Sequence, residues 1–467
     1  MILSKFFSNK LFLILLWFLI ILSINTNTDH LVSIETLFNQ SKLKDILNPI
    51  RLYLSISIFF FLLAATITNK TIGKNFYLPV IIFICYQFVQ IFSLLFSENN
   101  NSNIIYNVHS LNVLLFLNIY LTYYQNKIKN LLVFFFSILF FLFLVFYFIT
   151  ILKMFALGVH PYGYYESIIL FVDNVPRSSG IARTGLCLFV FSHFFLIKKM
   201  KKLSIFLSSI LFIPSILLNQ SRTILAIFII ILLMIFVLEL LKKNRSYKFY
   251  LNQLFYYLLI PSFFTILIFI SSNLFYKNIV PQYMDSKVYL FVITKIIPDK
   301  DLRKIINSND EQQIKRDAKT KDSSNKKVKI KILRTNDHES FSSQRFRDWK
   351  NIAILTNQNF LFGYGTQADR FLIQQTASNA LLYAYSSAGI LGLLSILFIY
   401  LRYFYIFLKS IKVFSSSGSV FLFSYIILIV FFLRSIFESS FAVFGIDFIL
   451  FALAIYNIEN EYKKYQG

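Results

Sequence analysis

The sequence predicts an all-α, polytopic integral membrane protein with about 12 transmembrane helices. Of its 467 residues, 57% are hydrophobic and only 15% are charged, which is too apolar for a soluble domain. Apolar windows of roughly 16 to 25 residues, long enough to cross a hydrocarbon core as helix, recur twelve times. Lys and Arg fall in short clusters between these windows, as in the loops of membrane proteins.

Each window is expected to be helical because the bilayer core holds no water to satisfy an open backbone. The first window follows a basic start but lacks a convincing signal-peptide cleavage site, so we interpret it as an uncleaved span. The windows are residues 6–24, 50–68, 76–97, 104–124, 131–152, 180–197, 203–218, 223–241, 251–276, 379–408, 419–437 and 441–457.

The basic clusters predict that both termini are cytoplasmic. With the N-terminus inside, every short loop expected on the cytoplasmic side contains Lys or Arg, and the outer loop 97–103 contains neither. The same placement argues against nucleic acid as a partner, although the formal net charge is +24. The basic segments are residues 69–75, 125–130, 198–202, 241–248, 409–412 and 463–464.

Three regions follow from this topology. Residues 1–276 contain spans 1 to 9, residues 277–378 form one large periplasmic loop domain, and residues 379–467 contain spans 10 to 12 with a cytoplasmic tail. Long loops cross the membrane regardless of their charge, so the basic residues of 277–378 do not change the orientation. The lysine-rich centre of that loop is expected to be mobile. Cys85 and Cys187 lie within apolar runs and suggest neither a disulfide framework nor a metal site.

The predicted outer face gathers polar residues from distant parts of the chain. Arginine at the end of a span is costly unless it pairs, binds a ligand or extends to the lipid head groups, and its guanidinium matches the oxygens of a diphosphate. Anchoring in the head-group region is the alternative for any single arginine. The residues are Arg177, Arg183, Arg222, Arg345, Arg347, Asn379, Arg434, Glu438 and Asp447.

Several motifs of this face resemble the O-antigen polymerase and O-antigen ligase superfamily of membrane glycosyltransferases. PRSSGIARTGL at 176–186 precedes NQSRTILA at 219–226, and NQNFLFGYG at 357–365 is similar to an aromatic-glycine segment that ends the family's large loop. Ser378-Asn379 precedes Gly389 and Gly392 at the family's spacing, and the last outer loop begins at Arg434. The proline of the aromatic-glycine segment is missing, and Ser378 replaces a histidine, which favours a polymerase over a ligase.

The resemblance implies a metal-independent, cofactor-free polymerase in the bacterial inner membrane. Its donor and acceptor are undecaprenyl-diphosphate-linked glycans, and a chain-length regulator and a flippase are its further expected partners beside membrane lipid. Arg177 and Arg222 are the expected catalytic cations, because a lipid diphosphate builds up negative charge as it leaves. Arg183, Arg345, Arg347 and Arg434 are expected to bind substrate.

A glycosyl transfer with inversion also needs a base near the acceptor hydroxyl. Glu438 and Asp447 are the first candidates, and His160 and His338 are others. The alternative for Asp447 is a buried ion pair with Arg434. Trp349 and Tyr364, with Ser378 and Asn379, are expected to contact the glycan. We expect Tyr383 and Tyr385 in an interfacial belt, Gly363 and Gly365 in a tight turn, and Gly389 and Gly392 in close helix packing.

Three alternatives to the polymerase stay open. An O-antigen ligase would transfer finished polymer to lipid A-core. A flippase or transporter of lipid-linked oligosaccharide fits the number of spans, but it would normally show two matched halves and no hundred-residue outer loop. A structural or signalling membrane protein would not require several arginines at one face.

Overall fold

The computed structural model is all-helical in the part of the chain that it describes. Seven of its helices are long and apolar enough to cross a membrane, and four shorter apolar helices accompany them. The described residues are 7, 9–24, 43–69, 76–97, 104–124, 128–157, 178–196, 200–240, 252, 255–278, 341–410 and 419–466.

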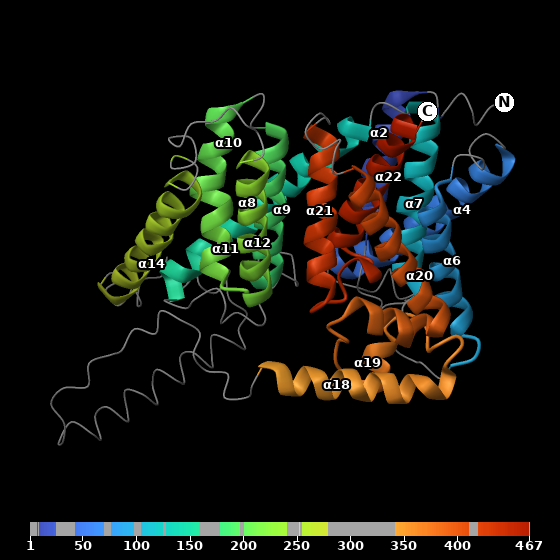
Figure 1. The fold of residues 1–467 in the computed structure, drawn as a ribbon. Coiled ribbons are helices and arrows are strands. Elements are labelled where there is room, and N and C mark those ends of the chain that lie inside the picture. The colour runs from blue at the N-terminus through green and yellow to red at the C-terminus, as the bar shows by residue number, and fades with distance from the viewer. Residues whose placement is uncertain are drawn as a thin grey trace, which may run out of the picture. The chain divides into compact units, whose positions relative to one another are not determined.

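The chain divides into two compact units (Figure 1). Unit 1 joins residues 1–135 to residues 339–467, and unit 2 contains residues 136–338. Of the predicted loop 277–378, residues 341–378 are described as part of unit 1, where α18 (Phe341–Thr356) and α19 (Ala368–Ile373) pack on α20 (Ala380–Ser410). The helix α8 (Ile128–Leu157) contains the boundary.

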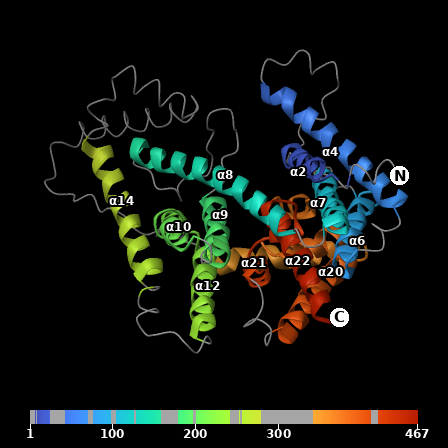
Figure 2. The ribbon, with the colours of Figure 1, turned by 90° about the horizontal axis from the view of Figure 1, so that it is seen from above.

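Unit 1 packs α6, α7, α20 and α22 side by side (Figures 1 and 2). Most of these helices are continuous apolar runs, so their inward faces bury large side chains such as Trp17, Phe83 and Tyr456. The elements of unit 1 are α2 (Lys10–Ser23), α4 (Leu43–Thr68), α6 (Leu78–Ser93), α7 (Ile104–Tyr124), α18 (Phe341–Thr356), α19 (Ala368–Ile373), α20 (Ala380–Ser410), α21 (Ser419–Ser435), the short 3₁₀ helix η6 (Ser440–Ala442) and α22 (Ile446–Gln466).

The helices of unit 1 alternate in direction, which defines two ends. At one end α18 lies across the helix termini (Figure 1), and there α6 and α21 finish and α7, α20 and α22 begin. We call this the α18 end. Asn69, directly after α4, donates to the hydroxyl of Tyr123, near the end of α7, at the opposite end. At that end Arg402 of α20 also pairs with Glu459 of α22. The helices α4, α7, α20 and α22, each of which precedes a predicted cytoplasmic segment, therefore end on the same side of unit 1.

The last predicted span begins and ends later than expected. The window 441–457 corresponds to α22, which starts at Ile446 and continues to Gln466. Phe441 lies in the short 3₁₀ helix η6 and is fully buried against neighbouring rings, so its apolar character reflects a packed turn. The polar last turns stay helical because Glu459 pairs with Arg402.

Unit 2 contains helices interrupted by short π-helical segments. In it, α9 packs against α11 and α12, and α11 against α14. Its elements are α9 (Ser178–Phe191), the π-helix η2 (Ser192–Leu196), α10 (Lys201–Leu207), the π-helix η3 (Ser208–Phe212), α11 (Ile213–Asn219), α12 (Arg222–Leu240), the π-helix η4 (Phe255–Leu259) and α14 (Ile260–Asn278).

Candidate functional site

The α18 end collects predicted residues from separate segments around one loop. Arg345 of α18 donates from its guanidinium to the carbonyl of Phe437 at 3.1 Å. Asn379 donates from its amide to the neighbouring carbonyl of Ile436, also at 3.1 Å, while its own oxygen caps α20. Two of the residues predicted to bind substrate therefore hold residues 436 and 437, at the start of the segment 436–445 that links α21 to α22.

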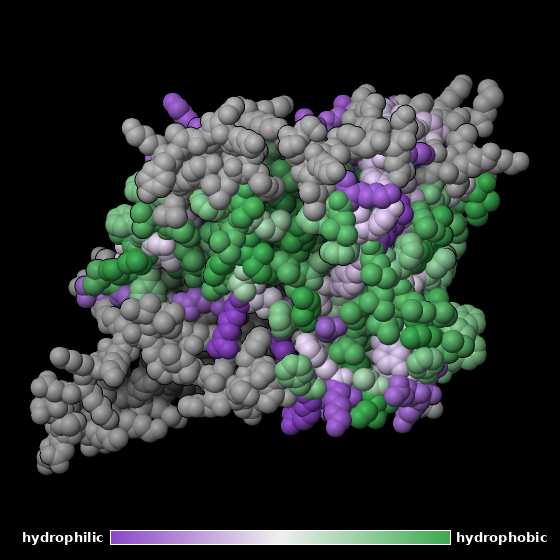
Figure 3. Space-filling view, viewed as in Figure 1, coloured by the Kyte–Doolittle hydropathy of each residue, from purple (hydrophilic) through white to green (hydrophobic). Residues whose placement is uncertain are grey.

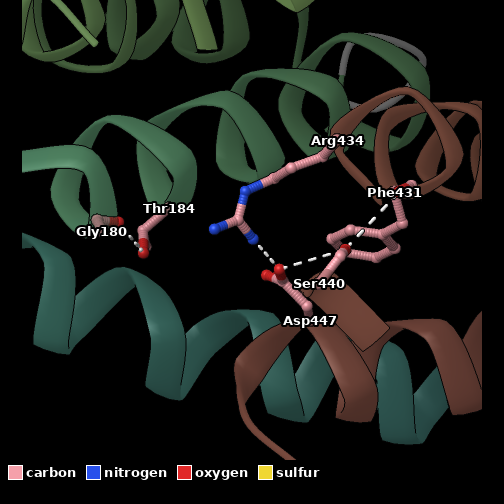
Figure 4. Close-up of polar contacts among 6 residues, drawn as sticks. All are labelled: Gly180, Thr184, Phe431, Arg434, Ser440 and Asp447. Carbon is pink, nitrogen blue, oxygen red and sulfur yellow. Dashed lines mark hydrogen bonds and ion pairs between the residues drawn. The ribbon is translucent and has the colours of Figure 1, made fainter. Parts of the chain in front are cut away.

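The last turn of α21 and the first turn of α22 carry a buried ion pair (Figure 4). Arg434 is 7% exposed and Asp447 2% exposed, and the guanidinium contacts the carboxylate directly. The hydroxyl of Ser440 donates to the same carboxylate oxygen at 3.4 Å. The ion pair with Arg434, which the sequence left open as the alternative to a catalytic Asp447, is thus present. Ser440 adopts a left-handed backbone, with φ of +39°, in the turn that makes this contact.

Glu438 lies in the same segment and has a different environment. Its side chain is partly exposed, and within the described residues its carboxylate has no hydrogen bond or ion pair. A general base must reach the hydroxyl that it deprotonates, and an accessible, unpaired carboxylate meets that requirement better than a buried, paired one. Of the two carboxylates predicted as bases, Glu438 is therefore the better candidate. Asp447 is placed to hold Arg434 and Ser440 in position.

The aromatic-glycine segment is built into a break in α20. At Ala388 and Gly389 the backbone of α20 leaves helical geometry. The N–H of Ile390 would bond to Ser386 in a continuous helix, but it donates to the carbonyl of Phe360 at 2.9 Å. Just before the break, the carbonyls of Ser386 and Ser387 accept from the N–H groups of Tyr364 and Gly365 at 2.8 and 2.9 Å. The loop is thus hydrogen-bonded to α20 on both sides of the break.

Three glycines make this junction possible. Gly363, Gly365 and Gly389 all have positive φ, and a Cβ on Gly363 would lie 2.6 Å from the nitrogen of Gly389. A Cβ on Gly389 would overlap the carbonyl group of Leu361. The predicted turn at Gly363 and Gly365 is confirmed. The expected role of Gly389 in helix packing is wrong, because a left-handed backbone and close approach to a loop are what require glycine there.

A buried polar cluster fastens the same loop to α6 and α7. Asn107 donates to Gln87 and Gln90 at 2.9 Å each, and the hydroxyl of Thr366 donates to Asn107. All four side chains are at most 3% exposed. The sequence analysis missed these residues, although amide side chains within apolar windows are a usable signal, because polar groups inside a span are costly unless paired.

The aromatic residues predicted to contact glycan have structural partners. The indole N–H of Trp349 donates to the carbonyl of Ala377 at 2.8 Å, and the hydroxyl of Tyr364 donates to Leu355 at 3.4 Å. Ser378 has a left-handed backbone and contacts Thr376. The expected interfacial belt is wrong for both Tyr383 and Tyr385: they are 2% and 8% exposed, because α6, α18 and α19 cover this part of α20.

Unit 2 brings two predicted arginines to one of its ends. Gly185 packs on Ser215, one turn before the end of α11, so Arg183 near the start of α9 lies at the same end as the junction of α11 and α12. At that junction Gln220 adopts φ of +46°, and α12 begins at Arg222, whose side chain is exposed. Thr184 bonds to its own helix at Gly180 (Figure 4).

Several predicted residues fall elsewhere. Arg177, His160 and His338 lie outside the described residues. Arg347 of α18 is exposed. His109 bonds to Ser55 and His193 to Tyr257, both within buried helix contacts. Among the residues that the structure describes, no group of three or more His, Cys, Asp or Glu side chains could hold a metal ion.

Comparison with protein-family models, with curated proteins and with solved structures finds no match to this chain.

Proposed function

We propose that the protein is a bacterial inner-membrane glycosyltransferase that polymerises oligosaccharide units carried on a lipid diphosphate, of the O-antigen polymerase type. One observation carries the proposal: Arg345 and Asn379 bind the segment that carries the partly exposed Glu438, and the ion pair of Arg434 with Asp447 lies at the same end of unit 1. Each of these residues belongs to a segment that the sequence analysis singled out independently.

The reaction breaks the bond between the anomeric carbon of the donor glycan and a diphosphate oxygen. The acceptor hydroxyl oxygen forms a bond to that carbon, its proton passes to Glu438, and the lipid diphosphate leaves with both bonding electrons. Arg345 binds the segment that carries Glu438, and Arg434 lies at the start of that segment, so both provide positive charge at this end of unit 1. A guanidinium stabilises the charge that develops on the leaving group.

Purified protein in proteoliposomes with a lipid-diphosphate oligosaccharide tests the proposal. Longer glycans should form without ATP or added metal, and Glu438→Gln should stop their formation while leaving the protein inserted. Movement of the glycan across the bilayer without lengthening would identify a flippase instead. Transfer of finished polymer to lipid A-core, with no lengthening, would identify a ligase.

A deletion strain gives an independent answer. Loss of a polymerase leaves one repeat unit on lipid A-core, whereas loss of a ligase leaves finished polymer on the lipid carrier. An unchanged surface polysaccharide would contradict both functions.

A further inference from the structure

Asp369, which no sequence motif marks, is a buried carboxylate close to the candidate site. It lies in the short helix α19 and is 3% exposed. Its Oδ2 accepts from the backbone N–H of Ala377 at 2.7 Å, and its Oδ1 accepts from the backbone N–H of Arg370 at 2.9 Å. Burial raises the pKa of this carboxyl above its ordinary value, and the two N–H donors oppose that shift.

The contact with Ala377 fixes the turn that leads into α20. Left-handed residues bound this turn, Gln374 with φ of +57° and Ser378 with φ of +49°. Such backbone geometry is unfavourable for residues other than glycine and persists only where surrounding contacts enforce it. The next residue, Asn379, caps α20 and holds the carbonyl of Ile436.

The same peptide unit also ties down α18. While the N–H of Ala377 donates to Asp369, its carbonyl accepts from the indole of Trp349 at 2.8 Å. One turn earlier on α18, Arg345 holds the carbonyl of Phe437. The hydrogen bonds from Arg345 and Asn379 to the two residues before Glu438 therefore come from α18 and from the start of α20, and these two elements are both held at Ala377.

We propose that Asp369 is a positioning residue of the site, which sets Asn379 and Arg345 on the segment 436–437 through the Ala377–Trp349 contact. The effect of Asp369 on catalysis by Glu438 rests on the proposed function, but the structural link from Asp369 through Ala377 to Trp349 does not. A carboxylate suits this position because two N–H groups converge on its two oxygens, whereas the asparagine isostere offers only one acceptor oxygen.

Tryptophan fluorescence tests the link without any substrate. The chain has two tryptophans, and Trp17 is buried against Phe116 in unit 1, so Trp17→Phe leaves Trp349 as a single probe. In this background, Asp369→Ala should raise the acrylamide quenching of Trp349 about twofold by loosening its contact, with Asp369→Asn in between. Asp348→Asn, which changes a carboxylate on α18, is the matched control and should leave quenching unchanged.

The asparagine variant also covers the case in which the alanine variant fails to fold. Two results would overturn the proposal. In the first, folded and inserted Asp369→Asn is quenched no more than the Trp17→Phe parent. In the second, Asp348→Asn increases quenching as much as Asp369→Asn does.

Kinetics test whether the link reaches the chemistry. Asp369→Asn and Trp349→Phe should each lower kcat about tenfold or more, and Asp369→Asn should leave the KM for the lipid-linked glycan unchanged, because the Asp369 carboxylate is buried and does not reach substrate. The double variant should be no worse than the more impaired single variant, since both act through Ala377. Additive losses, or a raised KM in Asp369→Asn, would contradict positioning. If wild-type protein makes no polymer, the proposed function fails while the fluorescence result still decides the link.

Discussion

Each end of unit 1 contains an ion pair to α22: the pair of Arg434 with Asp447 is buried, whereas Arg402 in the pair with Glu459 is partly exposed. At the end opposite α18, two guanidinium nitrogens of Arg402 donate to the two oxygens of Glu459 at 2.7 Å each, from Nε to Oε1 and from Nη2 to Oε2. At the α18 end, Arg434 contacts one oxygen of Asp447, and Ser440 shares that oxygen from a left-handed backbone.

This difference separates a structural ion pair from a candidate functional one. A two-point fork satisfies both partners and joins α20 to α22, which is sufficient for packing. The Arg434 pair sits instead beside an accessible carboxylate, Glu438, and a loop held by Arg345 and Asn379. Hydrophilic side chains also gather along α18, below helices covered by apolar ones (Figure 3).

The largest effect is expected from Arg434→Ala. Asp447 loses its partner in a buried setting, so the free energy of unfolding should fall by about 3–5 kcal/mol. Glycan lengthening per folded molecule should fall about a hundredfold or more, because a cation beside the reacting groups is gone. Arg402→Ala is the control: it should destabilise the protein but change the activity per folded molecule by no more than about twofold. An equal loss of activity per folded molecule in both variants would show that the Arg434 pair is no more functional than the Arg402 pair.

Glu438→Gln should affect chemistry without affecting stability. The rate of glycan lengthening should fall about a hundredfold, as for removal of a general base. The free energy of unfolding should stay within about 0.5 kcal/mol, because the carboxylate makes no hydrogen bond or ion pair among the described residues. Initial rates and denaturant unfolding measure the two quantities. A clear loss of stability with normal rates would assign Glu438 a structural role.

Gly389→Ala should loosen the aromatic-glycine loop. Alanine at φ of +60° is strained and its Cβ would overlap the carbonyl group of Leu361, so we expect a loss of about 1–3 kcal/mol and faster proteolysis of residues 357–367. Gly445→Ala is the matched control, because a Cβ there meets nothing within 4 Å. Equal thermal stability of the two variants would show that the junction with α20 contributes little.

The smallest effect concerns the pH dependence of stability. Because burial raises the pKa of Asp369 in the folded state, its protonated form favours folding, and this contribution is lost as pH rises through the folded pKa. Asp369→Asn cannot titrate. The stability of the wild type relative to Asp369→Asn should therefore increase as pH falls from 7 towards the ordinary range of a carboxyl. Thermal unfolding at several pH values measures the difference, and a constant difference would contradict it.

The sequence by itself determined where the helices lie. Every one of the twelve apolar windows contains a helix in the structure, because apolar length and the need to satisfy the backbone act locally along the chain. It also offered the pair of Arg434 with Asp447 as the alternative to a catalytic Asp447, since charged groups that close to a span require partners. Whether all twelve helices cross a membrane, and in which orientation, stays a prediction.

Only the tertiary structure decided how the α18 end is assembled. The break in α20, the hydrogen bonds of α20 with Tyr364 and Gly365, and the cluster around Asn107 join segments far apart in sequence. Asp369 stands in no motif, and its importance comes from the burial that desolvates it and from two N–H groups that converge on it. Such contacts depend on which backbone groups the fold leaves unpaired, and no local pattern in the sequence records that.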